Sequence, residues 1–339
     1  MVTLDREQTA APLIGVGLVG ESSTSRFLCE RLSLRCDLRL VAVCVEDNSK
    51  TQSPSSLSEI WFAGIACPAS MTVFNLIAAP EVRVIHFAAG SSSDMMFAAL
   101  ARSKSIIVEA PQELTSGELE RLASVAIEQG QIAAIYEPRR WDRDFLQARY
   151  ALMSGRIGKL MRLRYAVHDS RLPGELFPLG IARELGSHVL DQLLQLVGPI
   201  EWSVRGDSVP HVWRHFPSAS GPSDGFAASF EFAEEVSAII EIQTRSHLGY
   251  RSGWMLDGTA GAYRNGCLYT RTVDGEIVDE PLPAPTVSSD PFLDALGETL
   301  RGSSTDLPTV RDAVRVAAFL CNLPTEAQLP HRVALPASN

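Results

Sequence analysis

The amino-acid sequence predicts an α/β chain with two domains. Residues 1–137 are expected to form a doubly wound parallel sheet, because apolar strand-like segments alternate there with helical ones. Residues 138–323 are expected to form an α+β domain with a large, mostly antiparallel open sheet, because several strand-like segments follow one another without intervening helices. Residues 324–339 are left as a C-terminal tail. The length of 339 residues and the apolar content of 45% are sufficient for two hydrophobic cores.

The elements of the first domain follow from local patterns. Val82–Ala89 is a near-continuous apolar run with β-branched residues, which is typical of a parallel strand buried on both faces. Glu118 follows Thr115 at the spacing of a capping box, which marks the start of a helix. The other predicted strands are Leu38–Val45, Ser105–Glu109 and Ile132–Tyr136, and the predicted helices are Glu21–Arg31, Asp94–Ala101 and Ser116–Glu128.

A glycine-rich segment, Gly15-Val16-Gly17-Leu18-Val19-Gly20, stands between the apolar residues Pro12-Leu13-Ile14 and the first predicted helix. The order strand, glycine turn, helix and strand is the context in which the G-x-G-x-x-G pattern binds a dinucleotide. The first glycine is expected to make the tight turn and the second to admit the pyrophosphate. The third packs the helix on the sheet, with the helix N-terminus directed at the phosphates. The alternative is a glycine-rich turn that only packs.

The second domain is predicted from its unbroken run of strands and from helix stop signals such as Gly198-Pro199. The predicted helices are Arg143–Met153, Arg183–Val197, Pro291–Leu300 and Thr309–Leu320, and the predicted strands are Leu160–His168, Phe226–Phe232, Val236–Arg245, Gly253–Asp257 and Tyr263–Thr270. Residues 218–224 and 280–289 are rich in proline and serine and are expected to be connections.

Composition excludes several classes of function. The net charge of −10 and the isoelectric point near 5.3 argue against a nucleic-acid-binding surface. No apolar run reaches the length of about 18 residues that a membrane span needs, and the first residues lack the layout of a signal peptide. We therefore expect a cytoplasmic protein that binds neither nucleic acid nor membranes. The six cysteines lack metal-finger spacing and are expected to be reduced, mostly buried thiols.

Two segments at predicted strand ends carry acidic side chains. Glu46 and Asp47 follow the second strand, where a carboxylate accepts hydrogen bonds from the adenosine ribose and repels a 2′-phosphate. This position favours NAD over NADP, and a solvated turn is the alternative. Glu109-Ala110-Pro111 ends another strand at the carboxyl edge of the sheet, where ligands bind in such folds. An ordinary strand-end turn is the alternative there.

One helix of the second domain carries Glu184, His188 and Asp191 on a single face, because they are four and three residues apart. A carboxylate one turn from a histidine orients the ring and stabilises the imidazolium, so His188 is a candidate acid or base. A metal site and an ordinary helix face are the alternatives. Of these interpretations, the metal site is not expected.

Several motifs in the same order resemble those of the glucose–fructose oxidoreductase and inositol dehydrogenase (Gfo/Idh/MocA) family. The family's S-G-x-I-G is similar to Ser154–Gly158, its L-G-x-H-x-I-D to Leu185–Asp191, and its G-T-x-G to Gly258–Gly261. Arg140 stands where the family often has the arginine of an N-x-R segment. The resemblance extends from Leu13 to about Leu320.

The resemblance implies an NAD(P)-dependent oxidoreductase that transfers a hydride to or from a sugar, cyclitol or related polyol. It implies His188 as acid/base with Glu184 as its partner, and pairing of subunits into a homodimer or homotetramer through the C-terminal sheet. The residues expected to bind the cofactor are Gly15, Gly17, Leu18, Val19, Gly20, Glu46, Ala88, Ser91, Glu109 and Pro111. Those expected to bind substrate are Arg140, Trp141, Glu184 and His188.

The chain departs from the family at three places in the expected cleft. The family's E-K-P is replaced by Glu109-Ala110-Pro111, so the lysine beside the substrate hydroxyl is absent. The family's A-T-P-N-x-x-H is replaced by residues 88–94, and Val45 holds the usual position of the ribose aspartate. Three alternatives follow: a dehydrogenase that acts through His188, a lysine-free branch that uses NAD during glycoside cleavage, or a protein that binds NAD or sugar without turnover.

Overall fold

The computed structural model describes residues 13–44, 70–109, 114–168, 181–198, 202–203, 211–213, 225–232, 235–243 and 251–321. The chain divides into two compact units. Unit 1 contains residues 1–137 and 288–314, and unit 2 contains residues 138–287 and 315–339. The segment 288–314, which the sequence analysis placed in the second domain, therefore lies with the first.

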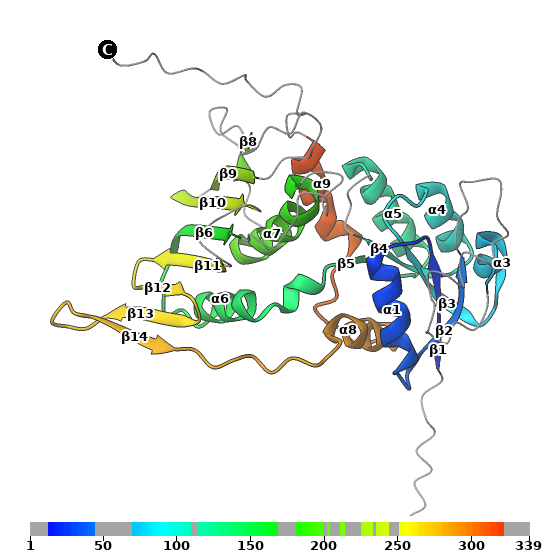
Figure 1. Ribbon diagram of the computed structural model, residues 1–339, viewed down its shortest axis with the longest axis horizontal. Coiled ribbons are helices and arrows are strands. Elements are labelled where there is room, and N and C mark those ends of the chain that lie inside the picture. The colour runs from blue at the N-terminus through cyan, green and yellow to red at the C-terminus, as the bar shows by residue number, and fades with distance from the viewer. Residues whose placement is uncertain are drawn as a thin grey trace, which may run out of the picture. The chain divides into compact units, whose positions relative to one another are not determined.

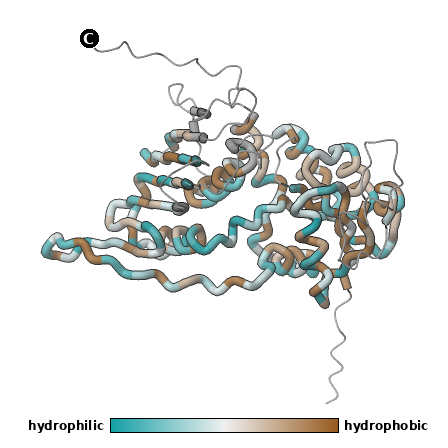
Figure 2. The backbone as a smooth tube through the Cα atoms, in the orientation of Figure 1, coloured by the Kyte–Doolittle hydropathy of each residue, from teal (hydrophilic) through white to brown (hydrophobic). Residues whose placement is uncertain are grey.

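Unit 1 is built on a five-stranded parallel sheet in the order β2-β1-β3-β4-β5, which confirms the predicted doubly wound, Rossmann-like sheet (Figure 1). Its strands are largely hydrophobic along their length (Figure 2) and are buried on both faces. The strands are β1 Ile14–Val19, β2 Leu38–Cys44, β3 Val82–Phe87, β4 Ser105–Glu109 and β5 Ala133–Tyr136. The helices are α1 Ser23–Ser33, α3 Val73–Ala78, α4 Ser93–Ala101, α5 Ser116–Glu128 and α8 Pro291–Leu300.

The helix α5 begins where its capping box predicts. The Thr115 hydroxyl accepts a hydrogen bond from the Glu118 backbone N–H, and the Glu118 carboxylate accepts one from the Thr115 N–H. These reciprocal bonds satisfy two donors that the first helical turn leaves without intrahelical partners. The capping box is therefore confirmed.

Unit 2 is built on a mostly antiparallel sheet in the order β14-β13-β12-β11-β6-β10-β9-β7, with β8 paired to β9. The pairing of β10 with β6 is parallel. The elements are the 3₁₀ helix η1 Pro138–Trp141, α6 Arg143–Met153, β6 Leu160–His168, α7 Ile181–Val197, β7 Trp202–Ser203, β8 His211–Trp213, β9 Gly225–Phe232, β10 Val236–Gln243, β11 Arg251–Gly258, β12 Gly261–Arg264, β13 Cys267–Arg271 and β14 Ile277–Pro281. The helix α9 Val310–Cys321 passes from unit 1 into unit 2.

One face of this sheet forms the core of unit 2. Leu163, Tyr165 and Val167 alternate along β6 toward the buried face, and Leu185 and Val189 of α7 belong to the same hydrophobic cluster. The predicted α+β domain with its open sheet is thus confirmed. None of the described helices is long and apolar enough to cross a membrane.

The strand predicted over Tyr263–Thr270 is wrong, because the chain reverses within it. Asn265 and Gly266 have φ values of 52° and 78° and form the two-residue turn between β12 and β13. Two consecutive left-handed residues match the twist of an antiparallel hairpin, and Asn-Gly is the preferred pair for it. The next strand, β14, occupies residues that the sequence analysis assigned in part to a connection.

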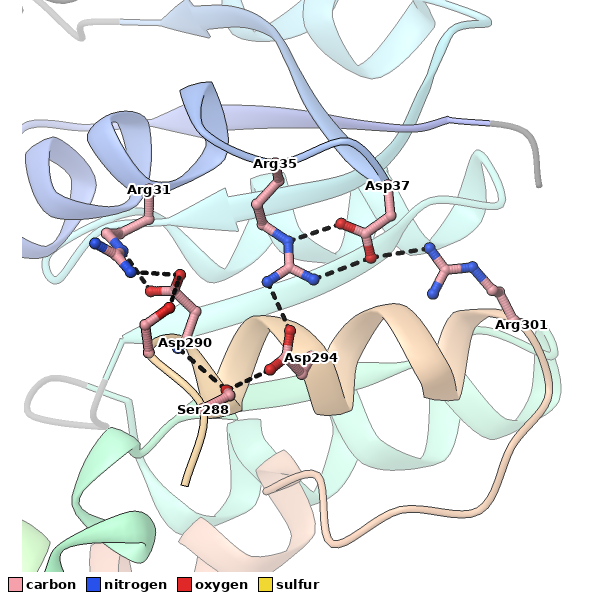
Figure 3. Close-up of polar contacts among 8 residues, drawn as sticks. Arg31, Arg35, Asp37, Ser288, Asp290, Asp294 and Arg301 are labelled. Atoms are coloured by element: carbon pink, nitrogen blue, oxygen red, sulfur yellow. Dashed lines mark hydrogen bonds and ion pairs between the residues drawn. The ribbon is translucent and has the colours of Figure 1, made fainter. Parts of the chain in front are cut away.

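A network of arginine–aspartate pairs attaches α8 to the rest of unit 1 (Figure 3). Arg35 donates two hydrogen bonds to Asp37, at 2.8 and 2.9 Å, and a third to Asp294 of α8, at 2.7 Å. Arg301 donates to Asp37 at 3.0 Å, and Arg31 of α1 binds the Asp290 carboxylate at the start of α8. These contacts explain why the segment 288–314 belongs to unit 1.

The Asp37 carboxylate should make the stability of unit 1 depend on pH. Burial opposes its ionisation, but hydrogen bonds from Arg35 and Arg301 outweigh burial and lower its pKa from 3.8 to about 2. Because the folded pKa is the lower one, the stabilisation is present above the unfolded pKa and is lost as the pH falls toward the folded one. Asp37→Asn should therefore lower the free energy of unfolding at neutral pH by about 1–2 kcal/mol.

Urea denaturation of the wild type and Asp37→Asn between neutral and acidic pH measures this effect. The difference between the two proteins should shrink on acidification. Asp279→Asn, which changes an exposed aspartate of β14, is the matched control and should alter stability little at any pH. A difference for Asp37→Asn that stays constant with pH would contradict the assignment.

Candidate functional site

The turn between β1 and α1 is the first component of the candidate site. Gly20 follows the last residue of β1 and has a φ of 86°, which a side chain would strain. Ser22 is the N-cap of α1, and its hydroxyl accepts a hydrogen bond from the Ser25 backbone N–H at 2.9 Å. No acidic residue lies in the first turn of α1. The turn therefore directs a helix N-terminus, which attracts anions, at the carboxyl edge of the sheet.

The glycine turn predicted over Gly15–Gly20 is wrong in position, because Gly15 and Gly17 lie inside β1. Both pair in register with β2 and β3. A Cβ atom on Gly15 would lie 1.9 Å from the Glu81 carbonyl oxygen, and one on Gly17 would lie 2.8 Å from the Leu76 side chain. These two glycines make room for neighbouring chain segments. The helix begins at Ser23, two residues later than predicted.

In the structure, the three glycine positions of the G-x-G-x-x-G motif are occupied by other residues than predicted. Counted from the end of β1, the three positions are Gly20, Ser22 and Ser25. Gly20 retains the left-handed turn, and Ser25 is small enough to be fully buried between helix and sheet. Leu18 and Val19, which the sequence analysis also assigned to the cofactor, are core residues of β1.

A second turn, after β3, lies against Gly20. A Cβ atom on Gly20 would lie 2.8 Å from the Ala88 Cβ and 3.4 Å from the Ser91 hydroxyl oxygen. The Glu109 carboxylate, at the end of β4, accepts hydrogen bonds from the Ser22 hydroxyl and from the Ala89 backbone N–H, the latter at 3.0 Å. Gly20, Ala88, Ser91 and Glu109 of the predicted cofactor site are thus brought together at one edge.

The Glu109 side chain is ionised in this setting. Burial opposes ionisation, but contact with His86 and the hydrogen bonds from Ser22 and the Ala89 N–H outweigh burial and hold the pKa below its usual value. Glu46, Ala110 and Pro111 of the predicted site lie outside the described residues, as does the side chain of Glu184 on α7.

In unit 2, η1 is fastened to α7 through charged and polar side chains. Arg140 donates two hydrogen bonds to the Asp191 carboxylate, at 2.7 and 2.6 Å, and both side chains are at least 90% buried. Gln192 donates to the Arg139 carbonyl oxygen and accepts from the Trp254 indole N–H at 2.9 Å. The predicted substrate residue Arg140 therefore uses two of its donors within the protein.

His188 lies on the same face of α7, one turn before Asp191 and Gln192. It is partly buried, as is the predicted substrate residue Trp141 of η1. Asp142, the N-cap of α6, makes no side-chain capping bond. Partial burial raises the pKa of Asp142, whose side chain is half exposed, and the charges of Arg139 and His188 oppose that rise. Asp142 is a carboxylate that interacts with His188 and that sequence analysis missed, although it directly follows the predicted substrate residue Trp141.

The described residues contain no group of three or more metal-ligating side chains of histidine, cysteine, aspartate or glutamate. In unit 2 the described groups offer a partly buried histidine, His188, near the Asp142 carboxylate. In unit 1 they offer a helix N-terminus beside a buried glutamate.

Comparisons with known proteins agree with this architecture. Residues 145–264 match a family model described as the GFO/IDH/MocA C-terminal domain. The resemblance to the Gfo/Idh/MocA family is confirmed. The chain is 26% identical over 191 residues to the uncharacterized oxidoreductase YhhX of Escherichia coli, which covers 54% of this chain and 53% of YhhX. It is 29% identical over 125 residues to the Bacillus subtilis scyllo-inositol 2-dehydrogenase (NADP(+)) IolW, which covers 35% of each protein.

The matched segment thus spans about half of the length of YhhX and less of IolW. Among solved structures, a NAD-binding protein from Listeria innocua has a TM-score of 0.71 at 20% identity, covering 91% of this chain and 96% of the other. An oxidoreductase from Bacillus cereus has a TM-score of 0.71 at 16% identity, covering 91% and 95%. These two similarities show the shared fold.

The Arg140–Asp191 pair should be essential for the stability of unit 2. Asp191→Asn leaves a buried guanidinium without its charge partner, so the free energy of unfolding should fall by about 3–5 kcal/mol. Replacing both residues, in Arg140→Met with Asp191→Leu, should recover much of that loss. Chemical denaturation measures both effects.

Glu280→Gln is the matched control, because it breaks the exposed Arg156–Glu280 pair of the same unit. It should change stability by less than about 1 kcal/mol. Equal losses from the buried and the exposed pair would contradict a special role for the Arg140–Asp191 contact.

Proposed function

We propose that the chain is an NAD(P)-dependent oxidoreductase that transfers a hydride to or from a sugar, cyclitol or related polyol. The observation that carries the proposal is the β1–α1 turn, in which left-handed Gly20 links a buried parallel strand to the N-terminus of α1. Turns of this kind bind the pyrophosphate of dinucleotides. The names of the relatives, oxidoreductases and an inositol dehydrogenase, support the reaction class.

The residues of the turn fit such a cofactor. Gly20 provides the turn, Ser22 and Ser25 are small, and the first turn of α1 carries no carboxylate that would repel phosphate. Ala88, Ser91 and Glu109 line the same edge and would contact the remaining parts of the cofactor. When bound, the nicotinamide supplies the hydride acceptor or donor. Because Glu46 and Asp47 disfavour a 2′-phosphate, NAD is proposed in preference to NADP.

The protein groups supply proton transfer and orientation. His188 is proposed to accept, at a ring nitrogen, the proton of the substrate hydroxyl as the hydride leaves the carbon that bears this hydroxyl. In the reverse direction His188 returns the proton. Glu184, one turn earlier on α7, is proposed to orient the ring. Arg140 and Trp141 are proposed to contact the substrate from η1. We also propose that subunits pair through the open sheet of unit 2, whose outer face exposes Ile239.

A second candidate function follows from Ala110, which holds the position of the family's lysine and has no ionisable group. A protein without that lysine could bind the dinucleotide and a sugar without turnover. Calorimetry with NAD and NADP, followed by the absorbance of the reduced nicotinamide over a panel of polyols, sugars and glycosides, separates the two candidates. Binding without reduction of the cofactor by any panel member would favour the second candidate. Absence of dinucleotide binding would contradict both.

Removal of the proposed base should abolish most of the turnover. His188→Ala should lower kcat by about 10²–10⁴-fold, the usual contribution of general-base catalysis, while the affinity for NAD stays unchanged. His168→Ala, which removes a β6 histidine in contact with Gln243, is the matched control. Wild-type turnover in His188→Ala would contradict the assignment.

The Asp142 carboxylate should set the pH profile of the reaction. Asp142→Asn removes a negative charge that interacts with His188, and loss of a nearby negative charge disfavours protonation of a base. The rising limb of kcat against pH should therefore move to lower pH. Because Asp142 makes no capping bond, the melting temperature should change little. An unmoved limb would show that Asp142 does not act on the catalytic proton.

A further inference from the structure

His86 is buried in an unusual way for a histidine. It lies in β3, has no exposed surface, and neither ring nitrogen makes a hydrogen bond within the described part of the chain. Neighbouring positions of β3 are apolar and continue the core, so a hydrophobic residue would satisfy packing alone. A polar ring that lacks hydrogen bonds in a core destabilises the fold unless another interaction compensates.

The compensating group is the Glu109 carboxylate. His86 Nε2 lies 3.3 Å from Glu109 Oε1, a charge contact whose angle does not qualify as a hydrogen bond. The same carboxylate accepts hydrogen bonds from the Ser22 hydroxyl and the Ala89 N–H. We call this set, Ser22–Glu109–Ala89, the clamp. It ties the β1–α1 turn to the turn after β3 through the end of β4.

An ionised carboxylate that is buried as deeply as Glu109 destabilises the fold unless a neighbouring group offsets its charge. Tyr136 of β5 is the register partner of Glu109 of β4 and is a second titratable neighbour of the carboxylate. Burial, followed by the charge of Glu109, raises the pKa of Tyr136 to about 12, so the phenol is neutral and cannot offset the carboxylate. His86 is the described group at ion-pair distance from this carboxylate, with Nε2 3.3 Å from Oε1, and it can offset the charge where Tyr136 cannot.

We propose that His86 is a positioning residue for dinucleotide binding, whose ring nitrogen beside Glu109 Oε1 offsets the carboxylate and so keeps the clamp in place and the β1–α1 turn open to a pyrophosphate. This proposal rests on the proposed function. Without His86 the uncompensated carboxylate beside Ser22 would repel the phosphates and draw water into the turn. With the His86 ring beside the carboxylate, the N-terminus of α1 determines the local attraction for anions.

A double-mutant cycle tests the proposal. His86→Leu, Glu109→Gln and the double variant are compared with the wild type by urea denaturation and by calorimetric titration with NAD. His86→Leu should weaken NAD binding by about tenfold or more, because one buried charge loses its partner. Adding Glu109→Gln should restore affinity to within about threefold of Glu109→Gln alone, since the unpaired charge is then gone. His168→Leu, in unit 2, is the matched histidine control and should leave NAD affinity unchanged.

The rescue distinguishes a charge effect from a packing effect. A merely structural role for the ring would leave the double variant at least as weak as His86→Leu, and this result would overturn the proposal. The free energies of unfolding should be non-additive in the same sense, and additive values would also overturn it. Absence of NAD and NADP binding by the wild type would instead overturn the proposed function, while the unfolding cycle still tests the His86–Glu109 pair by itself.

Discussion

The position of β1 between β2 and β3 is the constraint on which unit 1 depends. Both neighbours pair with β1 in parallel, so the carboxyl ends of the central strands meet at one edge. Close packing leaves no room for a side chain at either glycine of β1, because the Glu81 carbonyl lies against Gly15 and the Leu76 side chain lies against Gly17. Gly20, the first residue beyond the strand, is then the residue that turns the chain into α1. Gly15 and Gly17 are therefore required by the packing of the sheet, and Gly20 is required by the turn.

Charged side chains connect helices to their surroundings in both units. In unit 1 the arginines at positions 31, 35 and 301 hold α8 through aspartates, and in unit 2 the Arg140–Asp191 pair holds η1 against α7. The Arg140–Asp191 pair is largely shielded from water and the pairs of unit 1 only in part, so the two buried charges of unit 2 rely most on each other. The second pair has a further consequence, because η1 leads directly into Asp142, whose charge acts on His188. The same contact that stabilises the fold thus determines the surroundings of the proposed base.

Periodicity and capping signals predicted most elements because those signals are local. The helices α5 and α6 and the strand β6 occupy the predicted residues. The hairpin at Asn265–Gly266 was missed although its signal is also local, since the apolar pattern on either side suggested one continuous strand. The glycine motif failed for a different reason. G-x-G-x-x-G occurs at residues 15–20, but the end of a strand depends on the partners with which it pairs, and β1 continues through Val19.

The sequence by itself determined the fold class and the family resemblance, and it placed His188 and Asp191 on one helix, because each depends on spacing along the chain. The tertiary structure decided which residues meet at the edge of the sheet. Ser22, His86 and Glu109 are separated by tens of residues and carry no shared motif, yet parallel strand pairing brings them within contact distance. Burial, which no spacing reveals, then makes the ionisation of Glu109 depend on its neighbours.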